Sequence, residues 1–431
     1  MLLGMMKRRS SYKQLLFAAV ALFAVTSLIT SPSLQASGVS AAQASLKGAP
    51  DEKIPNQYIV VLKDNAQDGP NEVANQARES GAEVLYVYQY ALKGFAVRAS
   101  AQALEHIKNN PNVDHVEQDQ LVEIFAQTIP TGINRIDADL SSTKAGDGSG
   151  SVSVDIAIID TGIDLDHPDL NVYKQKSFVK GKRTADDDNG HGSHVAGTAA
   201  AKDNSVGVVG VSPGARLWAV KVLDRNGSGS MSAVIAGVDY VTQNAASIDA
   251  ANMSLGCKCT STSLNTAISS SVAAGVTYAV AAGNNAEDAR SFSPANHPDV
   301  ITVSAIADSD GKCGGRGSST SYGNDDTFAS FSNYGSTIEL AAPGVKIYST
   351  YKGGSYATLS GTSMATPHVT GAAGLYKASH PAASPSEVLA ALRASASTSS
   401  TVCDTTLNDG RGYFSGDKDS SAEPLLHVRT L

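Results

Sequence analysis

The sequence VDIAIIDTG at residues 154–162 decides the fold, because a mainly apolar, β-branched run ends there in a carboxylate and a glycine. Similar apolar runs recur at residues 216–222, 250–254, 277–281 and 300–303. Helix-forming segments lie between or after these runs, at residues 194–201, 230–244, 263–274, 366–377 and 384–394. Strands that lack polar alternation and are separated by helices indicate a parallel sheet covered on both faces. We therefore expect an α/β fold with a doubly wound, mostly parallel sheet and helices on both faces.

A smaller unit precedes this sheet. Its sequence predicts strands at residues 57–63, 83–90, 94–99 and 113–124, and helices at residues 70–80 and 101–109. The order β-α-β-β-α-β is that of a ferredoxin-like α+β domain. Such a fold by itself implies no function.

The composition limits the class of protein. With 42% hydrophobic and 17% charged residues, the 431-residue chain is typical of a globular protein, which excludes wholesale disorder. Its formal net charge of −8 argues against nucleic acid or anionic lipid as the main partner.

The N-terminus has the pattern of a secretory signal. Basic residues 7–9 precede an apolar run at residues 15–28, and small residues follow. An uncleaved membrane anchor is the alternative, but the run is shorter than the ~20 apolar residues that a spanning helix needs. We expect residues 1–41 to be the signal peptide with its cleavage zone and residues 42–56 to be a linker. The mature protein would then be secreted, extracellular and without a membrane anchor.

Four cysteines in an exported chain can form disulfides: Cys257, Cys259, Cys313 and Cys403. Three connectivities are possible, and the sequence does not choose among them. The pairing of Cys257 with Cys259 is geometrically strained, because alternate residues so close along a strand cannot easily bring their sulfur atoms together. A four-cysteine zinc site is a competing interpretation, but only one pair is closely spaced.

Three short motifs carry side chains with catalytic chemistry. Asp160 lies in IIDTG at the end of a predicted strand, His191 in NGHGSHVAGT and Ser363 in LSGTSMATPH. Taken singly, a turn-capping Asp, a structural His and an N-cap Ser are the commoner explanations. Pro367 suits the first turn of a helix, so we expect Ser363 at the amino end of that helix. The free N–H groups and the dipole there stabilise a negative oxygen.

Together, Asp, His and Ser in this order supply an orienting acid, a base and a nucleophile for acyl transfer. The order and the surrounding motifs resemble the subtilisin family of serine proteases, in particular its proteinase K-like and secreted bacterial branches, over residues 126–394. The resemblance implies a serine endopeptidase in which Asp160 orients His191. His191 takes the proton of Ser363, and Ser363 attacks the peptide carbonyl to form an acyl-enzyme.

The same resemblance implies an oxyanion hole and an S1 pocket. Asn284, in AAGNN, matches the family's oxyanion-hole amide, which acts with the main-chain N–H of Ser363; turn formation beside Gly283 is the alternative. The residues that would form the wall of S1 are Ala281, Ala282 and Gly283. Because the S1 and peptide-binding segments contain no acid, we expect broad specificity with an apolar or aromatic P1 residue.

Two segments match those that hold an extended peptide substrate by strand addition in the family. They are Gly227, Ser228 and Gly229 on one side and Ser254, Leu255 and Gly256 on the other. Met231 and Val234 would line the S4 subsite. Ordinary surface turns are the alternative for both segments.

Residues 57–125 resemble the family's propeptide, which assists folding and then inhibits the enzyme. The sequence IFAQTIP at residues 124–130 is similar to the family's maturation junction. The resemblance implies a zymogen that cleaves itself between Phe125 and Ala126. Residues 126–431 would be the peptidase, with a peripheral tail after Ser395. We expect a monomer whose partners are peptide substrates and its own propeptide; a stable, attached binding domain is the alternative.

The resemblance also implies structural Ca²⁺, which prefers six or more oxygen ligands. The expected ligands are the side chains of Gln127, Asp169 and Asn204 and the main-chain carbonyls of Lys202, Val206 and Val208. The acidic run at residues 186–188 is better explained as a solvated loop than as a metal site. A further ion could bind the Gly/Ser/Asp-rich insert at residues 308–326.

Two other functions remain open. A catalytically silent subtilisin-like scaffold would serve as a binding protein, which the complete set of three motifs disfavours. An esterase would not need the peptide-binding segments.

Overall fold

The computed structural model describes residues 53–120, 127–407 and 409–431. The expected signal peptide, most of the expected linker and the Phe125–Ala126 junction lie outside the described residues. In the described part of the chain, no helix combines the length and apolarity needed to cross a membrane.

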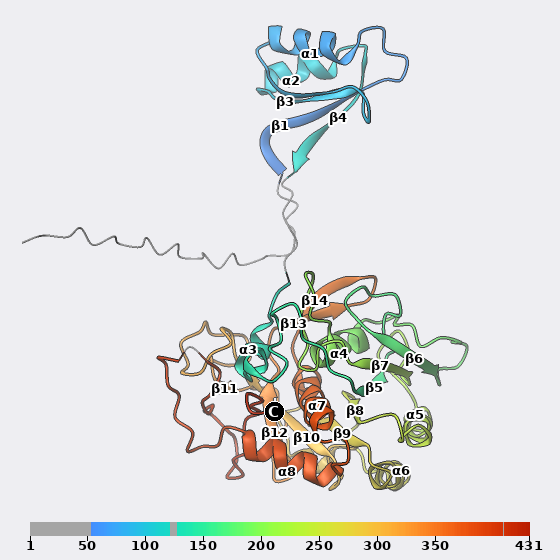
Figure 1. The fold of residues 1–431 in the computed structure, drawn as a ribbon, viewed down its shortest axis with the longest axis vertical. Coiled ribbons are helices and arrows are strands. Elements are labelled where there is room, and N and C mark those ends of the chain that lie inside the picture. Colours follow the sequence, from blue (N-terminus) through green and yellow to red (C-terminus); the bar gives the residue numbers. More distant parts are fainter. Residues whose placement is uncertain (1–52, 121–126, 408) are drawn as a thin grey trace, which may run out of the picture. The chain divides into compact units, whose positions relative to one another are not determined.

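The N-terminal unit is an antiparallel sheet with the strand order β2-β3-β1-β4 and two helices on one face (Figure 1). Its elements are β1 (Lys53–Leu62), α1 (Pro70–Glu79), β2 (Glu83–Tyr88), β3 (Gly94–Arg98), α2 (Ala101–Lys108) and β4 (Val113–Gln120). The helices bury Val73 and Leu104 in one core with Phe95. The predicted ferredoxin-like fold is confirmed, but β1 begins inside the expected linker, at Lys53.

The second unit is built on an eight-stranded sheet with the order β11-β10-β9-β8-β5-β7-β6, in which β12 pairs with β10. All neighbours are parallel except β10 and β11. The strands are β5 (Asp155–Asp160), β6 (Val172–Ser177), β7 (Arg216–Lys221), β8 (Ala250–Met253), β9 (Thr277–Ala281), β10 (Ile301–Ala307), β11 (Thr327–Phe328) and β12 (Leu340–Pro343). A separate hairpin joins β13 (Ile347–Tyr351) to β14 (Ser355–Leu359).

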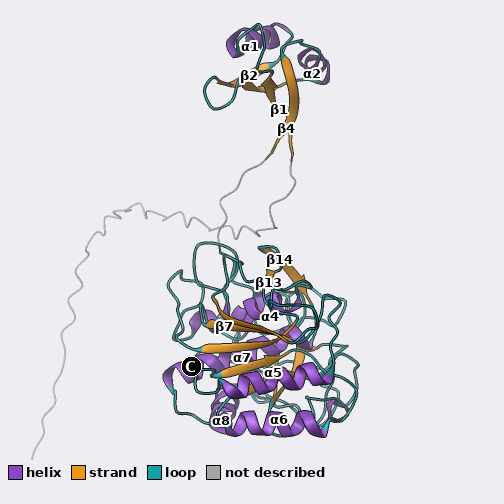
Figure 2. Ribbon diagram, turned by 90° about the vertical axis from the view of Figure 1, so that its right-hand side faces the viewer, coloured by secondary structure: helices purple, strands orange, loops and turns teal. Residues whose placement is uncertain are grey.

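Helices cover both faces of this sheet (Figure 2). They are α3 (Thr131–Arg135), α4 (His191–Ala200), α5 (Met231–Gln243), α6 (Thr262–Ala273), α7 (Thr362–Ser379) and α8 (Pro385–Ser395), with short 3-10 turns at Ala138–Leu140 and Ala289–Ser291. Ile156 and Ile158 of β5 pack in the core that includes α4, α7 and α8. Ala157 and Ile159 pack with α5 and α6. Burial on both faces explains why the strand lacks polar alternation, and it confirms the predicted α/β class.

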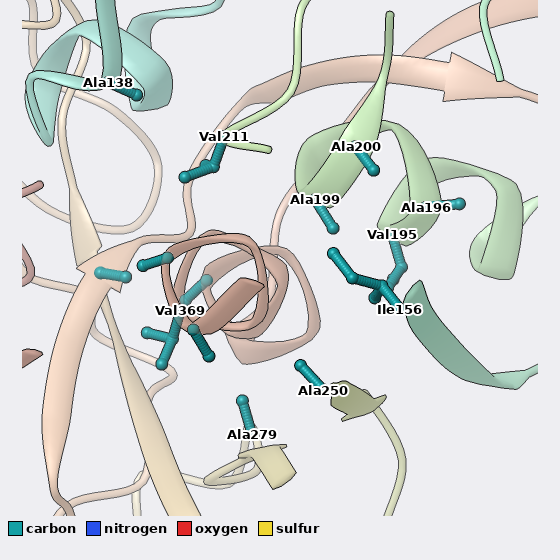
Figure 3. Close-up of a cluster of buried hydrophobic side chains, with 14 of the residues drawn as sticks. Ala138, Ile156, Val195, Ala196, Ala199, Ala200, Val211, Ala250, Ala279 and Val369 are labelled. Atoms are coloured by element: carbon teal, nitrogen blue, oxygen red, sulfur yellow. The ribbon is translucent and has the colours of Figure 1, made fainter. Parts of the chain in front are cut away.

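Helix α7 runs through the larger core, and small side chains surround it (Figure 3). A Cβ atom on Gly371 would lie 2.6 Å from the Cβ of Val211 and 2.8 Å from the carbonyl oxygen of Ala199. The close approach of α7 to α4 therefore requires a glycine at this position.

The chain after α8 is not a peripheral tail. Leu425, Leu426 and Val428 are fully buried. The Leu426 N–H donates to the carbonyl of Ala341 at 2.9 Å, and the Val428 N–H donates to that of Ile136 at 2.8 Å. The segment is polar on average, but it includes a short apolar stretch that packs against residues far away in the sequence. The prediction of a peripheral tail was therefore wrong.

The cysteines approach disulfide distance in two pairs, Cys257 with Cys259 and Cys313 with Cys403. The first pair is the one that we described as strained, and a tight turn instead of a strand brings it together. Strand β8 ends at Met253, and the N–H of Cys259 donates to the carbonyl of Cys257 at 2.8 Å. This tight turn brings the two Cα atoms to 5.3 Å, whereas alternate residues of a strand lie about 6.6 Å apart. The described residues therefore form no four-cysteine zinc site.

Candidate functional site

A cleft of about 630 Å³ contains the predicted site residues. It lies beyond the carboxyl ends of β5, β8 and β9, where ligands of parallel α/β sheets bind. The predicted residues that line it are His191, Gly227, Ser228, Gly229, Met231, Val234, Ser254, Leu255, Gly256, Ala281, Ala282, Gly283, Asn284 and Ser363. Asp160 is fully buried and contacts His191.

His191 is held against Asp160 where α4 begins. Its Nδ1 lies 2.7 Å from Oδ1 of Asp160, the last residue of β5. A Cβ atom on Gly192 would lie 2.0 Å from the carbonyl oxygen of Gly162, so this glycine lets the helix approach the strand end. Burial lowers the pKa of His191, but the charge and hydrogen bond of Asp160 outweigh burial and raise the pKa above its ordinary value. The pair can therefore orient the imidazole and stabilise its protonated form.

Asp187 joins this arrangement, although the sequence placed it in a solvated acidic run. Its carboxylate is buried and accepts hydrogen bonds from the Thr161 hydroxyl at 2.9 Å and from the Gly190 N–H at 2.8 Å. It also accepts two hydrogen bonds from Ser193, from its N–H at 2.9 Å and its hydroxyl at 2.6 Å. Asp187 thus connects the end of β5 to the start of α4. In the sequence, only its position four residues before His191 could have indicated this role.

The other two acids of this run also differ in environment. Asp188 forms ion pairs with Lys221 at 2.7 Å and with Lys182 at 2.9 Å, whereas Asp186 is exposed. The expectation of a solvated loop was therefore correct only for Asp186. The three acids face different partners, so nothing here resembles a metal site.

Ser363 lies in the first turn of α7, as predicted, but Pro367 does not. The helix begins at Thr362, so Pro367 falls inside it. Because proline has no N–H, the carbonyl of residue 363 lacks its usual helical donor. The Ser254 hydroxyl donates to that carbonyl at 2.9 Å instead. The interior proline thus leaves a free acceptor that joins α7 to the segment after β8.

The hydroxyl of Ser363 donates to the main-chain carbonyl of Ser254 at 3.2 Å. This is the hydrogen bond that the described structure gives it, and His191 lies across the same cleft. A nucleophile and its base are often loosely arranged without substrate and come together when it binds. A rotation about the Cα–Cβ bond of Ser363 would release Ser254 and redirect the hydroxyl.

Asn284 is positioned by a residue that the sequence did not single out. Its side-chain oxygen accepts hydrogen bonds from the N–H of Thr362 at 2.8 Å and from the Thr362 hydroxyl at 2.9 Å. The Gly283 N–H donates to the same hydroxyl at 3.1 Å. With the oxygen held in this way, the amide N–H₂ group is left beside Ser363 as a donor in the cleft.

The expected Ca²⁺ ligands gather around one loop. The Gln127 amide N–H₂ donates to the carbonyls of Lys202 at 2.7 Å and Val208 at 3.2 Å, while its side-chain oxygen is buried without a partner. Asp169 is fully buried, and its carboxylate accepts from Asn204 at 2.8 Å. Burial raises the pKa of Asp169. Converging carbonyls, a buried carboxylate and an unpartnered amide oxygen fit a hard cation. Val206 lies in the same loop and is partly exposed.

The insert at residues 308–326 contains an acidic group that could hold a metal ion. Single carboxylate oxygens of Asp308, Asp310 and Asp325 lie within 4.8 Å of one another. Arg135 is fully buried nearby and pairs with Asp308 at 3.2 Å and with Asp326 at 2.7 Å. The protein's own guanidinium therefore neutralises part of this charge.

Comparisons with known proteins show what the two units of the chain are similar to. Residues 151–414 match the subtilase family, and residues 57–125 match the peptidase inhibitor I9 family. Subtilisin J of Geobacillus stearothermophilus is 37% identical over 381 residues, 87% of this chain and 91% of that protein. The thermostable alkaline protease of Halalkalibacterium halodurans is 38% identical over 334 residues, 77% of this chain and 84% of that protein. The crystal structure of a cold-adapted subtilisin-like serine proteinase is 36% identical with a TM-score of 0.52, covering 64% of this chain and 89% of that one.

Proposed function

This chain belongs to the subtilase family and is a serine endopeptidase, and we propose that Asp160, His191 and Ser363 are its catalytic triad. The observation that carries this assignment is the 2.7 Å contact between His191 Nδ1 and buried Asp160, on a cleft that Ser363 also lines. His191 accepts the Ser363 proton as the hydroxyl attacks the scissile carbonyl, and then donates it to the leaving amine. Water resolves the acyl-enzyme by the same proton transfers in reverse order.

The oxyanion that forms in this attack is bound by the Asn284 amide and the main-chain N–H of Ser363. Two features support this assignment: Thr362 holds the amide oxygen, and the Ser363 N–H lies in the first turn of α7. Donors held in place before the reaction need no reorganisation when the charge develops.

Substrate specificity follows from the lining of the cleft. The peptide would lie extended between Gly227–Gly229 and Ser254–Gly256, with Met231 and Val234 at S4 and Ala281–Gly283 at S1. No Asp or Glu is among the lining residues, and Lys258 is the charged side chain besides His191. Broad specificity with apolar or aromatic P1 residues is the preference that such a lining favours.

The enzyme is made as a secreted zymogen and acts as a monomer. Residues 1–41 are the signal peptide and cleavage zone, residues 42–56 a linker, residues 57–125 the inhibitory propeptide and residues 126–431 the peptidase. The match of residues 57–125 to an inhibitor family supports this division. Self-cleavage after Phe125 releases the mature enzyme, and an apolar S1 pocket would accept Phe125.

Structural Ca²⁺ would be held by Gln127, Asp169 and Asn204 and by the carbonyls of Lys202, Val206 and Val208. Such an ion would neutralise the charge of the Asp169 carboxylate and would cross-link the start of the mature chain to this loop. It takes no part in the proton transfers.

The test is the Ser363→Ala substitution. The variant should accumulate as an uncut proform and should not react with a fluorophosphonate probe, whereas the wild type should mature and be labelled. Intact mass spectrometry of both purified proteins reads out the outcome, with Ser360→Ala as the matched control. Normal maturation of pure Ser363→Ala would contradict self-cleavage, and labelling of that variant would contradict the assignment of the nucleophile.

A further inference from the structure

An ion pair borders the cleft and joins the two segments that flank the proposed S1 pocket. Nζ of Lys258 lies 2.5 Å from Oε2 of Glu287. Lys258 follows Gly256 by two residues, and Glu287 follows Gly283 by four. Of the described residues that line the cleft, only Lys258 and His191 can carry a charge. The charge next to S1 is therefore set by Lys258 and its partner.

The backbone that carries Lys258 is fixed. Cys257 and Cys259, on either side of it, lie at disulfide distance. The N–H of Cys257 donates to the carbonyl of Ser293 at 3.0 Å, and the carbonyl of Cys257 accepts the N–H of Ser293 at 3.0 Å. Ser293 also lines the cleft. Lys258 therefore extends from a closed turn that is hydrogen-bonded to the cleft wall.

The backbone that carries Glu287 is held as well. Its N–H donates to Oδ1 of Asn333 at 3.1 Å, and its carbonyl accepts the N–H of Tyr334 at 3.1 Å. The neighbouring acid, Asp288, pairs with Arg290 at 2.5 Å. Glu287 is thus the carboxylate that faces Lys258, and the position of its backbone does not depend on the ion pair.

The ion pair itself adds little to the stability of the fold. Its side chains are 60% and 43% exposed, and ion pairs in contact with solvent are only weakly stabilising. Two long side chains in such a pair can separate when another charge competes for one of them. A substrate carboxylate in S1 would compete with Glu287 for the ammonium group of Lys258. A substrate ammonium group would be repelled by Lys258 and attracted by Glu287.

We propose that Lys258 is a specificity-determining residue that favours an acidic P1 residue over a neutral polar one of the same size, and that Glu287 limits this preference. Apolar and aromatic P1 residues remain preferred, because Ala281, Ala282 and Gly283 form the wall of S1. The ion pair ranks the polar P1 residues below them. This inference rests on the proposed function, since it requires S1 to lie in this part of the cleft.

The experiment measures kcat/KM of the purified active enzyme, prepared from the full chain, on peptides that differ only in a P1 Glu, Gln, Lys or Phe. The ratio of Glu to Gln isolates the effect of charge, because the two side chains have nearly the same size. Lys258→Gln should lower this ratio about fivefold and Glu287→Gln should raise it about fivefold, as one charge near a partly exposed group does. The ratio of Lys to Gln should change in the opposite directions. All four changes should shrink in about 1 M salt, which screens exposed charges.

Matched changes of charge away from the cleft serve as controls. Lys180→Gln and Asp404→Asn, both at exposed positions, should leave the two ratios at the parent's values. Shifts of opposite sign in Lys258→Gln and Glu287→Gln cannot come from a general loss of folding. If both variants cleave the Phe peptide and keep the parent's ratios, the inference is overturned while the proposed function stands. A parent enzyme that cleaves none of the peptides would overturn the proposed function, and this inference with it.

Discussion

The carboxylate of Asp187 illustrates how a single buried residue can organise this site. It accepts hydrogen bonds from Thr161 next to Asp160, and from Gly190 and Ser193 on either side of His191. Its negative charge also contributes to the raised pKa of His191. At the residue scale, the orientation and the basicity of the imidazole therefore depend on a side chain outside the triad.

Asp187→Asn should shift the acid limb of the pH profile of kcat/KM to lower pH. The negative charge of Asp187 stabilises the imidazolium, so its removal lowers the pKa of His191. The free base then persists to lower pH. Asp186→Asn, an exposed neighbour with the same change of charge, should leave the limb in place. If the acid limb of the pH profile does not move in Asp187→Asn, then Asp187 has only a structural role.

At the scale of elements, close packing of α4 against α7 places the two helices that carry His191 and Ser363. Gly371 has no room for a side chain because Val211 and Ala199 lie against it. The small residue Ala199 lies on the side of α4 nearer to α7 (Figure 3). The distance between base and nucleophile is thus set by backbone contact as well as by the catalytic side chains.

Gly371→Ala should destabilise the protein even though alanine favours helix by about 1 kcal/mol. The added methyl group would lie 2.6 Å from the Val211 Cβ, and overpacking of this kind costs about 1–3 kcal/mol. Chemical unfolding of the two proteins measures the difference, with Ala390→Ser on the exposed side of α8 as the control. If Gly371→Ala is as stable as the parent or more stable, then α4 and α7 can move apart without a loss of unfolding free energy.

Chelation by EGTA should lower the Tm by several degrees, because an ion at 100 times its Kd stabilises the fold by about 2.7 kcal/mol. This expectation follows from the loop around Asp169, whose oxygens converge with the orphaned amide oxygen of Gln127. Asp169→Asn should show a smaller shift in differential scanning calorimetry than the parent. If EGTA leaves the Tm unchanged, the proposal that this loop binds Ca²⁺ is contradicted.

At the scale of the whole molecule, the two cysteine pairs differ in what they connect. Cys313 and Cys403 are 90 residues apart and join the insert of residues 308–326 to the C-terminal segment. Cys257 and Cys259 are two residues apart and lie beside the cleft. A disulfide stabilises a protein by restricting the unfolded chain. The pair that closes the longer loop should therefore contribute more to the free energy of unfolding than the pair that closes the shorter one.

Replacing Cys313 and Cys403 with serine should cost about 2–5 kcal/mol of unfolding free energy. Replacing Cys257 and Cys259 should lower the unfolding free energy much less, because so short a loop restricts the unfolded chain only slightly. Denaturation of both double variants beside the oxidised parent measures this contrast. Equal losses would show that native-state contacts, and not chain entropy, determine the effect of each pair.

The sequence by itself determined the two folds, because apolar runs such as residues 154–159 and the alternating strands of residues 57–124 are local patterns. It also identified Asp160, His191 and Ser363 as candidate catalytic residues. The glycines next to them indicate places where backbone segments approach closely. The tertiary structure alone decided the hydrogen bond between Ser363 and Ser254, which are 109 residues apart. It likewise decided the support from Asp187, the burial of Leu425 and Leu426, and the cysteine pairs. Such contacts depend on where elements meet, and no local pattern in the chain encodes that.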